Sequence, residues 1–183
     1  MEVTQNKIKI LAILWETGRP MRSREVAERA KLSVPSSTMH LIQLRKKNYV
    51  FSPKKSLYTI TALGKEVIGL LKIDKKKALA ILSSVPEKAF YFYSAINQYI
   101  GISTDNLVDF CKKIQDMDPK VIEFHTLRGD FEFWFHDLGD EELVKKMKII
   151  SKRQLSREEL QKIVYTIVKS RCEELISISR KAK

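Results

Sequence analysis

"LSVPSSTMHLIQLRKKNYVFSPKKSLYTIT", residues 32–61, is the stretch that decides the fold of the first half of the chain. Its first part predicts a helix that begins after Ser33 as N-cap, ends at Asn48 and buries one face. That face consists of Val34, Leu41 and Leu44. Two short runs rich in aromatic and β-branched residues follow, separated by a Pro-Lys-Lys turn, which is typical of a β-hairpin.

The segments on either side of this stretch add three more helices. Residues 6–18 predict a helix that buries Ile8 and Leu11 and stops at Gly18. A second helix begins with Ser23 as its expected N-cap, and another follows Thr61 over residues 62–72. Helix, helix, turn, helix, hairpin and helix is the order of a winged helix-turn-helix.

The charge of the chain is concentrated in this half. The net charge is +12, and residues 1–77 hold seventeen Lys and Arg against six Asp and Glu, which leaves about +1 for the rest. A strongly basic lobe beside a balanced one indicates a polyanionic partner for the first lobe. A lysine-rich surface kept for solubility would not explain this asymmetry.

The outward face of the helix over residues 33–48 carries side chains suited to reading duplex DNA. Opposite the buried leucines it presents Ser36, Met39, His40, Gln43 and Lys47. In the major groove, Gln43 can form paired hydrogen bonds to adenine, Ser36 can bond a base or phosphate, and Met39 can meet a thymine methyl. The alternatives are that His40 is a partly packed residue and that Met39 fills the edge of the core.

Basic residues around this helix are expected to hold the phosphate backbone. They are Arg45, Lys46 and Lys47 at its end, Lys54 and Lys55 at the tip of the hairpin, and Arg22 and Arg24 at the start of the preceding helix. The lysine pair at the tip is otherwise only a solvated turn.

The residues of this half also resemble a known group of proteins. "LSVPSSTMHLIQLRKKNYVF" and "YTITALGKEVI" are similar to the recognition helix and the wing of MarR/ArsR/IclR-like winged-helix regulators. The resemblance covers about residues 4–72 and implies a DNA-binding function. The sequence departs from the pattern at Ser37, where such helices place an apolar residue, and at Asn48, where they place Gly.

The domain organisation follows from these patterns. Residues 1–73 are the expected winged helix-turn-helix domain, residues 74–87 a connecting segment, and residues 88–183 a mostly helical domain. The expected fold class is mainly α with a small β-hairpin, plus this helical C-terminal domain. Residues 89–96 fit either a strand or the start of a buried helix. The last helix, opened by a capping box of Ser156 and Glu159, carries a long apolar stripe. This stripe and residues 63–82 are the two candidates for a dimer interface.

The stretch "IEFHTLRGDFEFWFHDLGDEEL", residues 122–143, resembles an active site in composition only. Its two histidines are eleven residues apart, whereas a pair of metal ligands on one helix is normally three or four apart. Neither Cys111 nor Cys172 has a catalytic or metal-binding context, and both are expected to be buried free thiols. No catalytic residue, metal or cofactor is therefore predicted.

This stretch also resembles a family. With "FYFYSAINQYIGISTDNLVDFCKKI" it is similar to a small archaeal and bacterial domain of unknown function whose pattern is EFHxxRGDFExW followed by LGDxEL. The resemblance covers about residues 88–176 and implies no activity. The same residues suggest a polar pocket for a small ligand, formed by His125, Arg128 and Asp130.

Together these observations predict a DNA-binding transcriptional regulator in the cytoplasm, with double-stranded DNA as partner and a homodimer as the assembly. No apolar run reaches the length of a membrane-spanning helix, and no membrane partner is expected. Two alternatives stay open. One is a protein–protein adaptor with a winged-helix module, and the other is a small-ligand-binding protein centred on residues 123–137.

Overall fold

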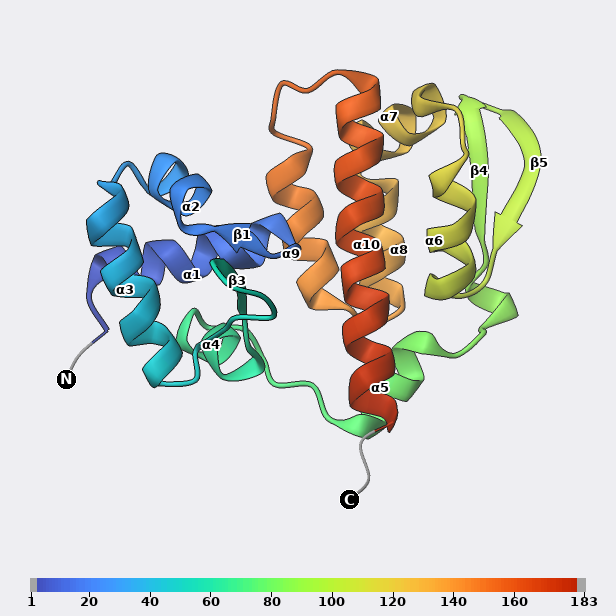
Figure 1. The fold of residues 1–183 in the computed structure, drawn as a ribbon. Helices are drawn as coiled ribbons and strands as arrows, with labels where there is room; N and C mark the ends of the chain where they lie inside the picture. The colour runs from blue at the N-terminus through green and yellow to red at the C-terminus, as the bar shows by residue number, and fades with distance from the viewer. Residues whose placement is uncertain (1–2, 181–183) are drawn as a thin grey trace. The chain divides into compact units, whose positions relative to one another are not determined.

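The computed structural model describes residues 3–180, which divide into two compact units with the boundary between Lys72 and Ile73. The first contains α1 (Gln5–Thr17), β1 (Met21–Arg22), α2 (Ser23–Ala30), α3 (Val34–Lys46), β2 (Val50–Phe51), β3 (Leu57–Ile60) and α4 (Ala62–Val67). The second contains α5 (Lys75–Leu82), the 3-10 turn η1 (Pro86–Lys88), β4 (Phe90–Ala95), β5 (Gln98–Thr104), α6 (Leu107–Gln115), α7 (Pro119–Arg128), α8 (Asp130–Asp137), α9 (Glu141–Ile150) and α10 (Arg157–Arg180) (Figure 1). The chain is mainly α with two small antiparallel sheets, so the predicted fold class is confirmed.

The first unit packs its helices against a three-stranded sheet. The strand order is β1-β3-β2, with Met21 opposite Tyr58 and Val50 opposite Ile60. Apolar side chains from α1, α2, α3 and all three strands form one core: Ile10, Leu11, Leu14, Met21, Val26, Ala30, Leu41, Leu44, Val50 and Tyr58. The sequence missed that β1 joins the hairpin as a third strand.

Short polar signals in the sequence fix where these elements begin and end. The Ser33 hydroxyl accepts the Ser36 N–H at 3.3 Å at the start of α3, and the Thr61 hydroxyl accepts the Gly64 N–H at 3.0 Å at the start of α4. Asn48 has a φ of 59° after α3 and Gly18 a φ of 67° after α1. These four predicted helix ends are confirmed.

Other local expectations were wrong. Ser23 is the first residue of α2 rather than its N-cap, and the Arg22 N–H is bound instead by the Glu25 carboxylate at 2.9 Å. Val34 and Ile8 are both 43% exposed. Ser37 is fully buried and its hydroxyl donates to the Ser23 carbonyl at 3.4 Å, which explains how a polar residue is tolerated at this core position.

The helix after Thr61 is shorter than expected. It ends at Val67, and Gly69 follows with a φ of 78°, so the chain leaves the first unit as a loop instead of a helix extending from Leu63. Gly64 is required in this helix because a Cβ there would lie 2.1 Å from the Tyr49 carbonyl oxygen.

The second unit is built around α10, against which α5, α6, α7 and α9 pack (Figure 1). The apolar stripe of α10, a candidate for a dimer interface, is mostly used inside the unit: Leu160, Val164, Ile167, Val168 and Leu175 belong to its core. Within residues 74–87, Ala78 and Ile81 of α5 are also part of that core. None of the described helices is both long enough and apolar enough to cross a membrane.

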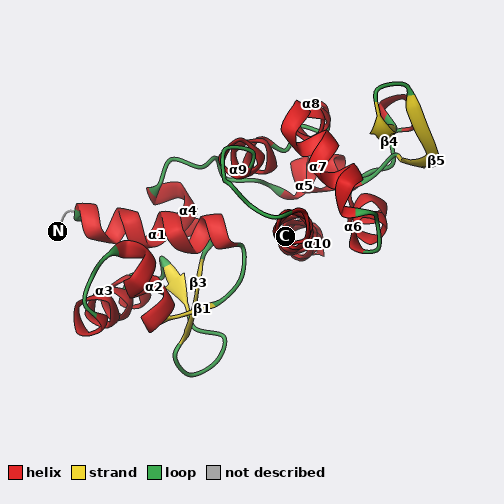
Figure 2. Ribbon diagram, turned by 90° about the horizontal axis from the view of Figure 1, so that it is seen from above, coloured by secondary structure: helices red, strands yellow, loops and turns green. Residues whose placement is uncertain are grey.

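The β4–β5 hairpin lies at one edge of this helical unit and contacts α7 and α6 (Figure 2). Residues 89–96 are therefore a strand, and β5 was not predicted. Between the pairs Tyr91–Ser103 and Tyr93–Tyr99, β4 advances by two residues and β5 by four. The extra residues form a bulge around Gly101, whose φ of 77° is readily adopted only by glycine.

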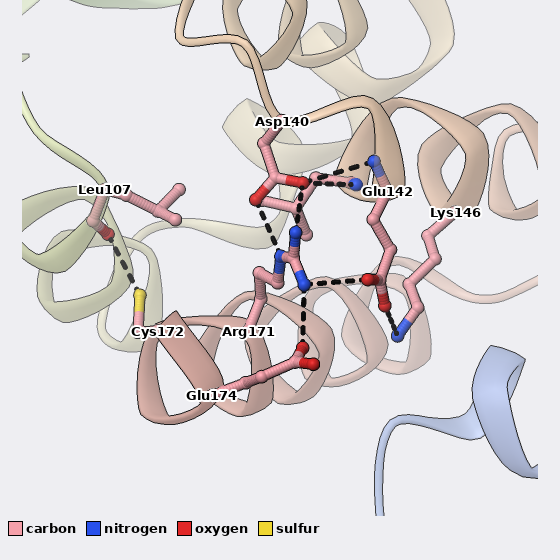
Figure 3. A network of polar contacts seen from close by, with 8 residues as sticks. Leu107, Asp140, Glu142, Lys146, Arg171, Cys172 and Glu174 are labelled. Carbon is pink, nitrogen blue, oxygen red and sulfur yellow. Dashed lines mark hydrogen bonds and ion pairs between the residues drawn. The ribbon is translucent and has the colours of Figure 1, made fainter. Parts of the chain in front are cut away.

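A buried ion network joins α9 to α10 (Figure 3). The Arg171 guanidinium donates to both carboxylate oxygens of Asp140, at 2.8 and 3.1 Å, and to Glu142 at 2.7 Å. Glu174 accepts a further bond at 2.7 Å from the same guanidinium, and Lys146 lies 3.8 Å from Glu142. Asp140 also accepts the N–H groups of Glu142 and Leu143, which confirms it as the N-cap of α9.

This network satisfies charges that have almost no contact with water. Arg171 is 2% exposed and Asp140 is fully buried. Burial alone would lower the pKa of the Arg171 guanidinium, but the charges of Asp140 and Glu142 outweigh this effect and hold its pKa above its ordinary value. Since each group compensates another, removal of one partner leaves a buried charge unpaired.

We therefore expect Asp140→Asn to lower the free energy of unfolding of the second unit by about 3–5 kcal/mol, the usual cost of breaking a buried ion pair. Urea unfolding followed by the fluorescence of Trp134, in a Trp15→Phe background, measures this effect. Glu174→Gln is the control, because Glu174 is 28% exposed and its loss costs less. Equal effects of the two substitutions would contradict the assigned role of Asp140.

Candidate functional site

The predicted DNA-reading face of α3 lies outside the core of the first unit. Met39 is 51% exposed, and Ser36 and Gln43 are half-buried. The buried face is formed by Ser37, Leu41 and Leu44. The helix therefore presents the expected side chains away from its core.

His40 is the exception on this face. It is half-buried, and its Nδ1 atom is buried without a hydrogen-bond partner. Only the other ring nitrogen is left for an outside partner. His40 is thus closer to the packed residue that was the alternative interpretation than to a free reader of bases.

The basic residues predicted to hold phosphates are exposed. These are Arg22, Arg24, Arg45, Lys46, Lys47, Lys54 and Lys55. Arg24 lies 3.4 Å from the Glu28 carboxylate, but both side chains are more than two-thirds exposed, so this pair contributes little. Lys54 and Lys55 lie in the turn between β2 and β3.

The sequence from Arg29 to Lys65 contains no Asp or Glu and eight Lys and Arg. This acid-free segment runs from the end of α2 through α3 and the hairpin to α4. Consequently no carboxylate within it neutralises the basic side chains. The electrostatic potential over this part of the unit is expected to be positive.

A second candidate site lies in the second unit, where His125, Arg128 and Asp130 come together. His125 Nδ1 is 2.7 Å from the Asp130 carboxylate, and the Tyr93 backbone N–H donates to His125 Nε2 at 2.8 Å. Because Nε2 accepts, the proton is on Nδ1 and the ring is neutral. Burial lowers the pKa of His125 below its ordinary value, against the opposing effect of the Asp130 carboxylate.

His125 therefore has a structural role: its two ring nitrogens link α7 to β4 and to α8. Both ring nitrogens are occupied by protein groups, so the ring has no lone pair with which to take a proton from a ligand. The aromatic side chains Phe90 and Phe131 pack around it, with ring centroids 4.9 and 5.5 Å away.

Arg128 and Asp130 form the accessible part of this cluster. Arg128 Nε is 3.3 Å from the nearer Asp130 oxygen, and the guanidinium carbon lies 4.9 Å from the centre of the Phe124 ring. The Arg128 side chain is 50% exposed and that of Asp130 26%. Among the described residues, no hydrogen bond or ion pair engages the two terminal amino groups of Arg128.

These residues line a cavity of about 380 Å³ between β4, the hairpin turn and α7. The other lining residues are Ala89, Phe90, Tyr91, Tyr93, Ala95, Ile96, Asn97 and Phe124. The volume lies in the range of about 300–1,000 Å³ that is usual for small-molecule sites. The sequence missed these walls because the hairpin was not predicted, although the i, i+4 spacing of Phe124 and Arg128 could have indicated their contact.

The described residues contain no group of three or more His, Cys, Asp or Glu side chains arranged to hold a metal ion. Cys111 and Cys172 are buried and unlinked.

Comparison with known families matches residues 35–169 to DUF5752, described as a family of unknown function. The match covers more than half of the chain, so the protein belongs to this family. Searches among curated proteins and solved structures returned no match. The family is consistent with the unknown-function domain seen in the sequence, but it begins inside α3 instead of near residue 88. The relation to winged-helix regulators stays a prediction.

Because His125 is neutral in the folded chain, the free energy of unfolding is expected to depend on pH. Its pKa is lower in the folded chain than in the unfolded chain, so the unfolded state binds more protons as the pH falls below about 6.5. The stabilisation is complete above that pH and is lost as the pH falls toward the folded-state pKa. We expect His125→Gln, whose amide can replace both bonds, to flatten the fall in unfolding free energy between pH 6.5 and 5. Urea titrations at several pH values measure it, and an unchanged slope would show that His125 is not held neutral.

Proposed function

We propose that this protein binds duplex DNA through its first unit and regulates transcription. The proposal rests mainly on the acid-free segment from Arg29 to Lys65, which carries eight cationic side chains. Nothing in the requirements of folding demands such a run without a single carboxylate, whereas a basic segment free of acids favours binding to a polyanion.

The geometry gives these charges a suitable arrangement on DNA. An α-helix of the length of α3 fits the major groove, and its exposed Met39 and half-buried Gln43 lie outside the core. Arg45 and Lys46 at the end of the helix are proposed to contact phosphates. Lys54 and Lys55 at the hairpin turn would contact the adjacent backbone or minor groove.

We also propose that two copies bind paired half-sites, since a single helix reads only a few base pairs. The stripe of α10 that is buried within the second unit is not available for this contact. Gel filtration with and without a bound duplex would test the stoichiometry.

The first test concerns the phosphate contacts. If about six side chains neutralise phosphates, the logarithm of the binding constant should fall with the logarithm of salt concentration with a slope near −5. Lys46→Ala combined with Lys47→Ala should weaken binding and reduce the steepness of the slope by about 1 for each lost phosphate contact. Fluorescence anisotropy with a labelled duplex, selected from random sequences, measures both quantities.

The matched control is Lys145→Ala combined with Lys148→Ala, which removes the same charge from exposed positions of α9. Unchanged affinity in the first variant, with the fold intact, would contradict the proposal. Weak binding to duplexes with no sequence preference would instead favour an adaptor for an acidic protein partner.

The second test concerns base reading. Gln43→Ala should reduce discrimination between the selected duplex and one with a substituted A·T pair by about 1–3 kcal/mol, while non-specific affinity and salt slope stay unchanged. Competition binding at fixed salt measures the ratio. A uniform loss of affinity for all sequences would mean that Gln43 does not read a base.

A further inference from the structure

We infer that the cavity lined by β4, α7 and the first residue of α8 binds a free α-amino acid with an apolar or aromatic side chain. The inference concerns the second unit alone and does not depend on DNA binding. Its basis is the combination of one cation, one anion and an aromatic wall in a cavity of amino-acid size.

The charges of the cavity balance one another. Arg128 contributes one positive charge and Asp130 one negative charge, while His125 is held neutral by its bond from the Tyr93 N–H. A simple anion would gain from Arg128 but be repelled by Asp130, and a simple cation would meet the reverse. A zwitterion gains from both groups at once, because its opposite charges are held close together.

Each of the two charged side chains retains a part with which to bind. Arg128 is engaged by Asp130 only through Nε, which leaves its terminal amino groups for a carboxylate, the planar group that a guanidinium binds best. Asp130 receives its short bond from His125 on Oδ2. Its Oδ1 has only a 3.5 Å contact with Arg128 Nε and can accept a bond from an ammonium group.

Two contacts hold these groups in place before a ligand arrives. The guanidinium of Arg128 lies over the Phe124 ring, and Asp130 is fixed by the buried His125. A site whose polar groups are already oriented loses less conformational entropy on binding. The bond from His125 therefore serves to position Asp130.

The rest of the cavity suits an apolar side chain. Tyr91, Tyr93 and Phe124 supply aromatic surface, and Ala95 and Ile96 supply aliphatic surface. Tyr91 is 50% exposed and Ile96 70%, so both have apolar surface still to bury. Burial of such surface favours an amino acid with a leucine-, methionine- or phenylalanine-like side chain.

Isothermal titration calorimetry on the full chain tests the inference, with L-phenylalanine, L-leucine and L-methionine at millimolar concentration as probes. At least one should bind. For L-phenylalanine, the analogues 3-phenylpropionate, which lacks the ammonium, and phenethylamine, which lacks the carboxylate, should each bind about tenfold more weakly or worse. The corresponding analogues serve if another amino acid binds best.

Variants assign the charges. Arg128→Gln should weaken amino-acid binding about tenfold or more, and Asp130→Asn should do the same while keeping an acceptor for the His125 N–H. Arg157→Gln is the matched control, because Arg157 pairs with Glu123 at the surface and does not line the cavity. It should bind like the unaltered protein.

The inference is overturned if none of the three amino acids binds, or if 3-phenylpropionate binds as tightly as L-phenylalanine, which would mark a simple anion site. Unchanged affinity in Arg128→Gln also overturns it. If Asp130→Asn does not fold, as judged by circular dichroism, the affinity of the Arg128→Gln variant decides by itself, because Arg128 is exposed. DNA binding is measured separately, so either proposal can fail without the other.

Discussion

The buried guanidinium of Arg171 is the constraint on which the second unit depends. It is 2% exposed, and the unit can hold a charge in that environment only because Asp140 and Glu142 are fixed beside it. Asp140 in turn caps α9 with the same carboxylate, so the start of that helix and its attachment to α10 are determined together. The "LGDEEL" residues 138–143 therefore have a structural explanation. The carboxylates of Asp140 and Glu142 join α9 to α10 through Arg171, whereas Glu141 pairs at the surface with His136.

The two units differ in how their carboxylates are distributed along the chain. In the second unit, cations are paired with nearby carboxylates, as Arg171 is with Asp140, Arg157 with Glu123 and Lys113 with Asp109. In the first unit, the acid-free segment offers α3 and the hairpin no carboxylate of their own. Such an arrangement carries a cost in self-repulsion, which a partner with dense negative charge would relieve. Net charge alone conceals this difference, because it does not say where along the chain the carboxylates lie.

Local sequence signals were enough to predict most of the helix ends in the first unit. Ser33, Asn48 and Thr61 act within a few residues along the chain, so their roles can be inferred from neighbouring sequence. The same reasoning failed for Val34, because the side of α3 that is buried depends on how α1 and α2 pack against it. It also failed for β5, where Gly101 and the bulge around it interrupt the alternation by which a strand is normally predicted.

In the second unit, Arg171 and Asp140 are 31 residues apart, and an arginine on a long helix is expected in solvent unless a distant carboxylate is known to meet it. The proximity of His125, Arg128 and Asp130 could be predicted from the sequence. These residues are at most five positions apart at a corner between two helices, so they lie close together in space. What the sequence lacked was the opposite wall of the cavity, which comes from β4 about 30 residues earlier.

The roles within that trio follow from what each group has left to offer. His125 is the residue that would attract attention as a catalyst, yet the Tyr93 N–H occupies the nitrogen that a general base would need. Protonation of that nitrogen would place two N–H groups against each other, which is why burial and geometry both favour the neutral ring and a lowered pKa. The surface that remains open consists of the Arg128 amino groups, the outer oxygen of Asp130 and the aromatic wall. Such groups recognise charge and shape, so this corner of the fold is better equipped to hold a ligand than to transform one.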